Sequence, residues 1–153
     1  MNNYSFQHSI KPRKNTNDEL LIQVLDGLLE KYIERVPDAQ KVVNLMASQG
    51  NIIVNDHIAF RSIDIRSILK IFIHLGYKVK MDTNTNKPFN FKEKKLTAVW
   101  LKHPNSNAPR IFVSQFRFNE GSTKLKAIIN SYIGDWKDPI NSINLNSASE
   151  INN

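Results

Sequence analysis

The chain has 153 residues, no cysteine, a formal net charge of +7 and 41% hydrophobic residues. This length suits one domain, and the hydrophobic content is sufficient for a core. The lack of cysteine excludes disulfides, thiolate metal sites and cysteine nucleophiles. No apolar run approaches the ~20 residues that cross a bilayer, and the polar start of the chain is unlike a secretory signal. We therefore expect a cytoplasmic protein.

The positive charge is concentrated in the middle of the chain. Residues 66–117 carry 11 basic and 2 acidic groups, whereas residues 1–65 carry 7 and 8. Such a block attracts anions at long range. No RNP-type aromatic motif, zinc-finger spacing or Gly-rich phosphate loop accompanies it. We interpret it first as a solvated face or an attractor of small anions, and a basic nucleic-acid-binding domain ranks last.

Two helices are predicted near the N-terminus. Residues 1–15 have no hydrophobic period and are expected to form a flexible arm. A T-x-x-E capping box at residues 16–19 opens an amphipathic helix that ends before Pro37. Pro37 opens a second helix, and Gly50 ends it.

The centre of the chain then follows the order β-α-β-β-β, with a further helix behind it. The expected segments are a strand at 57–63, a helix at 64–76, strands at 77–81, 96–102 and 110–118, and a helix at 122–133. We expect a single α+β domain over residues 16–134, with a loop at 82–90 and a disordered tail at 135–153. One such module forms a half-barrel whose concave face needs a second copy or a partner to close it.

His57 and Arg61 are the main candidates for chemistry. They lie on one face of a predicted strand, about 13 Å apart at ~3.3 Å per residue. An imidazole is a good ligand for iron, zinc or copper, and a guanidinium grips a carboxylate through two bonds. Together they would suit a metal-bound organic acid. The alternative is structural: His57 caps the strand beside Asp56, and Arg61 pairs with an acidic residue.

Other polar residues have a more ordinary interpretation. His74 is expected to be half-exposed on a helix, and His103 to be solvated at a hairpin tip. Lys95 could point into the concave face of the half-barrel, although a solvated charge at the sheet edge is the commoner role. Trp100 and Phe112 are expected in the core, because they alternate on strands.

The sequence Ile-Val-Asn-Asp-His-Ile-Ala-Phe-Arg-Ser at residues 53–62 resembles the signature of the iron(II)-dependent 2-oxoadipate dioxygenase/decarboxylase family, also called hydroxyglutarate synthase. Further matches occur in the family's order between about Asp18 and Phe118. They are residues 32–39, 75–77, 91–96, 103–104 and 111–114.

This resemblance implies a vicinal-oxygen-chelate-like fold with iron(II) as cofactor and a small 2-oxo acid as ligand. It implies that His57 binds the metal and the 2-oxo acid, and that Arg61 holds a substrate carboxylate. The family is an oxidoreductase family that converts 2-oxoadipate and O2 to 2-hydroxyglutarate and CO2 in lysine breakdown.

The family's second iron-binding histidine and its glutamate lie in a C-terminal module, and after Phe118 we match no segment to it. We therefore expect a truncated or split member of the family, whose site is completed by a second subunit or by self-association. The alternative is a non-catalytic remnant or small-acid-binding module.

Overall fold

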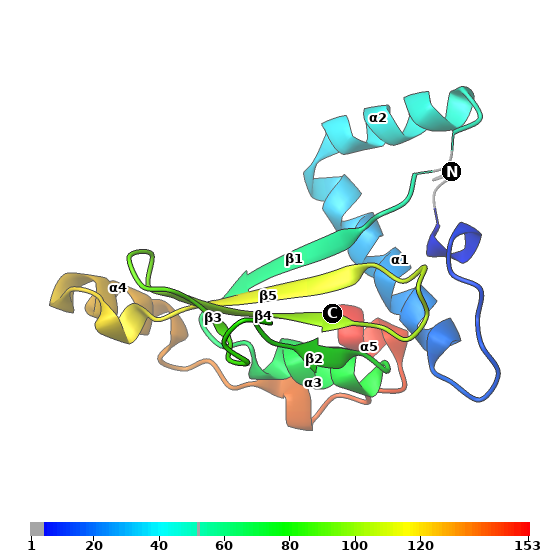
Figure 1. The fold of residues 1–153 in the computed structure, drawn as a ribbon. Coiled ribbons are helices and arrows are strands. Elements are labelled where there is room, and N and C mark those ends of the chain that lie inside the picture. The colour runs from blue at the N-terminus through cyan, green and yellow to red at the C-terminus, as the bar shows by residue number, and fades with distance from the viewer. Residues whose placement is uncertain (1–4, 52) are drawn as a thin grey trace.

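The computed structural model describes residues 5–51 and 53–153, in which helices precede and follow one mixed five-stranded sheet (Figure 1). The strands are β1 (His57–Ser62), β2 (Lys78–Lys80), β3 (Phe89–Phe91), β4 (Leu96–Lys102) and β5 (Arg110–Phe116). The α-helices are α1 (Asp18–Arg35), α2 (Pro37–Ser48), α3 (Arg66–His74), α4 (Thr123–Ile133) and α5 (Ala148–Asn152). Short 3-10 helices occupy Phe6–His8, Phe118–Glu120 and Pro139–Asn141.

The strand order is β1-β5-β4-β2, with β3 also paired to β4. β1 runs parallel to β5, and the other pairs are antiparallel. The predicted β-α-β-β-β order is therefore present. The exception is β3, because Phe89–Phe91 lies at and just beyond the end of a segment expected to be a loop. It pairs with the start of β4 around a turn in which Lys95 has a φ of 51°.

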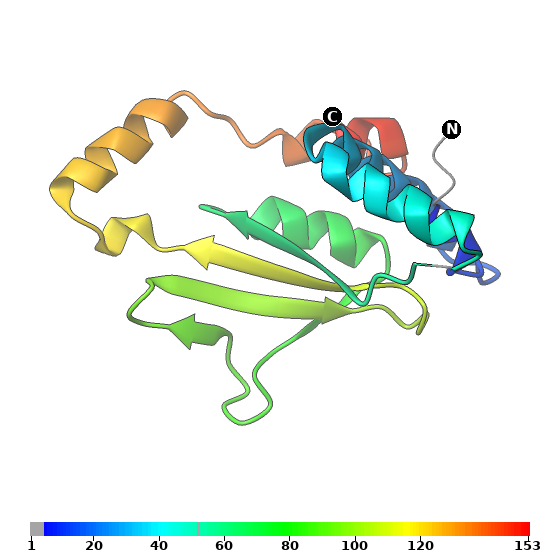
Figure 2. The same cartoon turned by 90° about the horizontal axis from the view of Figure 1, so that it is seen from above.

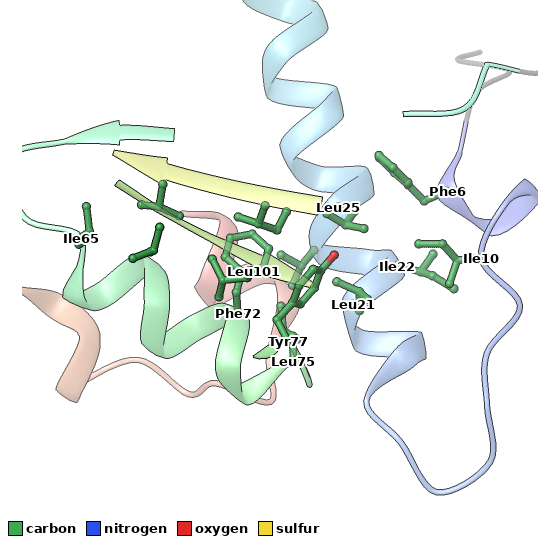
Figure 3. Packing of buried hydrophobic residues seen from close by; sticks show 14 residues of the cluster. Phe6, Ile10, Leu21, Ile22, Leu25, Ile65, Phe72, Leu75, Tyr77 and Leu101 are labelled. Atoms are coloured by element: carbon green, nitrogen blue, oxygen red, sulfur yellow. The ribbon is translucent and has the colours of Figure 1, made fainter. Parts of the chain in front are cut away.

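The hydrophobic core lies on one side of the sheet. Figure 2 shows α1, α3 and α5 on that side, and Figure 3 shows how side chains from α1 and α3 meet those of the central strands. Leu21, Leu25 and Leu75 are fully buried against Leu101 and Ile111. Because alternate strand residues point to opposite faces, Val99, Leu101, Ile111 and Val113 enter this core together.

The described parts of both terminal segments, residues 5–15 and 135–153, differ from the flexible arm and the disordered tail that the sequence led us to expect. Phe6 and Ile10 are buried in the core, and the Asp26 carboxylate accepts a hydrogen bond from the Phe6 N–H at 2.7 Å. At the other end α5 packs on α1, and Ile151 lies against the core. The Phe6–Asp26 contact spans 20 residues and the α1–α5 contact more than a hundred, so the local hydrophobic period reveals neither.

The start of α1 also differs from the expected capping box. The helix begins at Asp18, and its N-cap Asn17 makes no side-chain cap. The Thr16 hydroxyl donates to the carbonyl of Arg13 at 2.9 Å, while the Asp18 carboxylate accepts from the Arg13 guanidinium. Polar contacts with the preceding segment therefore hold this helix end.

Within residues 5–51 and 53–153, none of the helices combines the length and apolar character required to span a bilayer.

Candidate functional site

β1 places His57 and Arg61 on the side of the sheet that faces away from the core. His57, Ala59 and Arg61 are exposed, whereas Ile58 and Phe60 are partly buried against the core. The predicted shared face is therefore confirmed. We call this side of the sheet the open face. It includes His57, Ala59, Arg61, Trp100, Arg110 and Phe112, and the lysines Lys78, Lys80 and Lys102 lie on the same face further across the sheet.

A shallow hollow of about 350 Å³ lies on the open face around His57. Arg110 of β5 is the direct cross-strand neighbour of His57. The Arg110 guanidinium carbon lies 5.7 Å from the centre of the Trp100 ring, a cation–π distance that holds the charge over the hollow. Phe112 completes the apolar wall. The hollow thus combines an imidazole, a guanidinium and two aromatic rings.

The His57 ring is oriented by the residue before it. Its Nδ1 lies 2.9 Å from the Asp56 carboxylate, and this bond lowers the pKa of Asp56. In the described part of the chain, no hydrogen bond engages Nε2. A histidine that holds a carboxylate with one ring nitrogen and leaves the other open has the arrangement typical of a metal ligand.

Arg61 lies at the other end of β1 and does not line the hollow. Its cross-strand neighbour is Ser114, whose hydroxyl donates to the Phe60 carbonyl at 3.3 Å. Among residues 5–51 and 53–153, no carboxylate pairs with the Arg61 guanidinium. The alternative interpretation, in which Arg61 pairs with an acidic residue, is therefore wrong for these residues. Its charge is exposed on the open face and is accessible to an anion.

The described residues contain no cluster of three or more His, Asp or Glu side chains that could hold a metal ion. His57 contributes one imidazole, and the adjacent Asp56 carboxylate is bonded to that ring. The described residues therefore offer one metal ligand, the His57 imidazole. One ligand does not make a complete iron site.

Four expectations about individual residues need correction or restatement. Lys95 does not point into the concave face of the sheet, because its ammonium donates to the Glu120 carbonyl at 2.6 Å. Trp100 and Phe112 lie on the open face, outside the core. His103 is buried rather than solvated at a hairpin tip. Arg110 was not singled out from the sequence, although its place two positions before Phe112 on one strand could have indicated it.

His103 belongs to a buried polar network at the opposite side of the sheet. Its Nδ1 accepts the Asn105 N–H at 3.1 Å, and its Nε2 donates to the Leu75 carbonyl at 3.2 Å. Burial lowers the pKa of His103, which favours the neutral ring. The hydrogen bonds of Arg13 hold the pKa of Asp18 far below its usual range, and Asn105 adds to this effect at 3.0 Å. These bonds stabilise the fold. The candidates for a functional role therefore remain the residues of the open face.

Comparison with known proteins agrees with this architecture. The model of the 2-oxoadipate dioxygenase/decarboxylase family matches residues 24–151. This chain belongs to that family. The match continues well beyond Phe118, where the similarity was expected to fade, because α4 and α5 are part of the matched region.

One curated relative is the 2-oxoadipate dioxygenase/decarboxylase, chloroplastic/amyloplastic, of Oryza sativa subsp. japonica. It is 29% identical over 132 residues, which cover 76% of this chain and 35% of the relative. The solved hydroxyglutarate synthase of Oryza sativa, in complex with 2-oxoadipate, has a TM-score of 0.69 and 27% identity. That match covers 82% of this chain and 43% of the synthase.

A protein from Ralstonia eutropha JMP134 named for the glyoxalase superfamily has a TM-score of 0.73. The match covers 94% of this chain and 52% of that protein. At 17% identity this likeness shows the fold alone. The family member described here therefore spans about half, or less, of the length of the relatives it matches.

Proposed function

We propose that this chain forms one wall of a binding site for a 2-oxo dicarboxylic acid of the 2-oxoadipate type. The observation that carries the proposal is the position of His57 and Arg61 on the open face, with neither buried in the core. An imidazole stands at one end of β1 and a guanidinium without a carboxylate partner among the described residues at the other. Family membership, and a relative solved with 2-oxoadipate, support this choice of ligand.

Arg61 is proposed to hold the remote carboxylate of the acid. A guanidinium binds a carboxylate through two parallel hydrogen bonds, and such charge-assisted bonds are among the strongest in proteins. Arg110 adds a second positive charge beside His57, where the 2-oxo acid end would lie. The Arg61 and Arg110 guanidinium groups on β1 and its neighbour β5 match the two carboxylates of a dicarboxylate.

The family's chemistry requires iron(II), which would activate O2 for decarboxylation and hydroxylation of the bound acid. We propose that His57 would be one of its ligands, through the free Nε2. The remaining ligands would come from outside the described residues, as expected for a split site. What this chain's own residues do is bind and orient the acid, because their donors do not complete the metal site.

Calorimetric titration with 2-oxoadipate tests the acid-binding role. We expect Arg61→Gln to weaken binding about tenfold or more, because it removes a charged two-bond contact. The matched control is Arg35→Gln, which changes the net charge equally at the exposed end of α1. Titration with 2-oxohexanoate, which lacks the remote carboxylate, should show equal affinity for the wild type and Arg61→Gln. Equal weakening by both arginine variants would contradict the proposal and indicate general charge attraction.

A further inference from the structure

The open face carries a row of cationic side chains that crosses the sheet at right angles to its strands. His57 on β1 is paired with Arg110 on β5, and Lys102 on β4 is paired with Lys78 on β2. Continued by one residue, the β4–β5 register places Lys102 opposite Arg110. We call Arg110, Lys102 and Lys78 the cationic row. With neighbouring strands ~4.8 Å apart, this row and His57 together span about 14 Å.

The cationic row has no acidic counterpart on the sheet. None of the five strands contains an aspartate or a glutamate. Lys78, Lys102 and Arg110 are exposed, and no hydrogen bond or ion pair between described residues engages their side-chain nitrogens. Asp56, which precedes β1, is bonded to the His57 ring. Because like charges directly opposite each other destabilise a sheet, an anion bound along the row would relieve their repulsion.

Protection of the sheet edge does not account for this row. A lysine on a border strand discourages pairing with another chain, and this role suits Lys78 on β2. The strands β4 and β5 lie inside the sheet, where both neighbouring strands are already in place. Lys102 and Arg110 therefore have no edge to protect, and we take these two adjacent internal charges as evidence for an anionic ligand.

A pair of aromatic side chains lies beside the cationic row, two residues further along the strands. Phe112 and Trp100 are paired across β5 and β4, and both are partly exposed. They line the hollow around His57. Lys102 and Arg110 also line a second hollow of about 710 Å³, whose other walls consist mainly of polar residues. The two cations therefore lie between an aromatic surface and a polar one.

We propose that the open face binds single-stranded nucleic acid, with phosphates along the cationic row and bases stacked on Phe112 and Trp100. Proteins that bind single strands combine a positively charged groove for the backbone with aromatic rings for the bases, and a four-stranded sheet is a common platform for them. From charge alone a nucleic-acid partner ranked last. The exposed rings, which were expected in the core, are the observation that changes this ranking.

This binding mode goes beyond the proposed function and depends on other residues. Lys78 and Lys102 do not line the hollow around His57, and Arg61 is not part of the cationic row. We therefore expect Lys78→Gln and Lys102→Gln to weaken nucleic-acid binding and to leave the affinity for 2-oxoadipate unchanged. Equal weakening of both ligands would indicate general charge attraction and overturn the proposal. A chain that binds the oligonucleotide as expected but not 2-oxoadipate would contradict the proposed function alone.

Fluorescence anisotropy with a labelled oligothymidylate of about 12 nucleotides, within the usual range of site sizes, tests the cationic row. Loss of one phosphate contact should reduce the slope of log affinity against log salt concentration by roughly 0.7. We expect this change for Lys78→Gln and for Lys102→Gln. The matched control is Lys124→Gln on α4, an exposed lysine beyond the other end of β5 (Figure 1). Equal changes of slope in the control and the row variants would overturn the proposal.

Phe112→Leu tests the stacking of bases, because it removes the ring and keeps an apolar side chain. We expect oligothymidylate to bind at least about fivefold more weakly, with an unchanged salt slope. A duplex of the same length, whose bases are already paired and stacked, should bind more weakly than the single strand. A folded Phe112→Leu variant that binds as tightly as the wild type, or a duplex that binds as tightly as the single strand, would overturn the proposal. Circular dichroism checks the fold of Phe112→Leu; if it is unfolded, the duplex comparison decides.

Discussion

Asp18 shows how single residues hold the N-terminal region to the rest of the fold. Its carboxylate is buried, yet it accepts from the Arg13 Nε and Nη2 at 2.9 Å each and from the Asn105 amide at 3.0 Å. These bonds tie α1 to the segment before it and to the turn between β4 and β5. A buried carboxylate is tolerated only when its charge is paired and its oxygens are bonded.

We expect Asp18→Asn to lower the free energy of unfolding by about 2 kcal/mol, because a neutral amide cannot satisfy the donors that now meet the carboxylate. Chemical denaturation measures the change. Asp38→Asn is the control: Asp38 pairs with Lys41 on the exposed surface of α2, and its removal should leave the midpoint unchanged. Equal effects of the two substitutions would show that burial does not govern the Asp18 contribution.

The position of a single side chain could be predicted where the local alternation of side chains along a strand determines it. The two-residue alternation of a strand was sufficient to place His57 and Arg61 on one face, and the structure agrees. His103 was expected to be solvated because it follows a strand and precedes Pro104. Its burial depends on the carbonyl of Leu75, 28 residues away, and on Asn105. No local pattern in the sequence carries that contact.

At the scale of elements, the terminal segments complete the core that the central module leaves open. The Phe6–His8 turn inserts Phe6 against α1, and α5 covers α1 from the other end of the chain. The helices α1, α3 and α4 and the longer strands were predictable from their hydrophobic periods and from Pro37 and Gly76 at their limits. The terminal segments were not, because each contributes one or two apolar residues whose partners are distant in sequence.

Phe6→Ala is expected to destabilise the protein by about 3 kcal/mol, since Phe6 is only 2% exposed and its removal leaves a cavity. Ile128→Ala on α4 removes a side chain that is 47% exposed and should change the stability by less than about 0.5 kcal/mol. Thermal and urea denaturation of both variants provide the measurement. A Phe6 variant as stable as the wild type would contradict this prediction and support the flexible arm that the sequence led us to expect.

At the scale of the whole molecule, the residues proposed to bind the acid are present, whereas the ligands of a complete iron site are not found among the described residues. The open face carries the groups proposed to bind the acid, while the described residues offer a single imidazole for iron.

We therefore expect the purified chain, supplied with iron(II), 2-oxoadipate and O2, to consume no more oxygen than iron and 2-oxoadipate alone. Iron sites of this reaction class need two histidines and a carboxylate converging on one ion. An oxygen electrode measures the uptake. His57→Ala and His74→Ala form the matched pair, because His74 is a histidine on α3 bonded to Asn146, away from the open face. Uptake well above the blank that His57→Ala abolishes and His74→Ala preserves would show that this chain assembles a working iron site with His57.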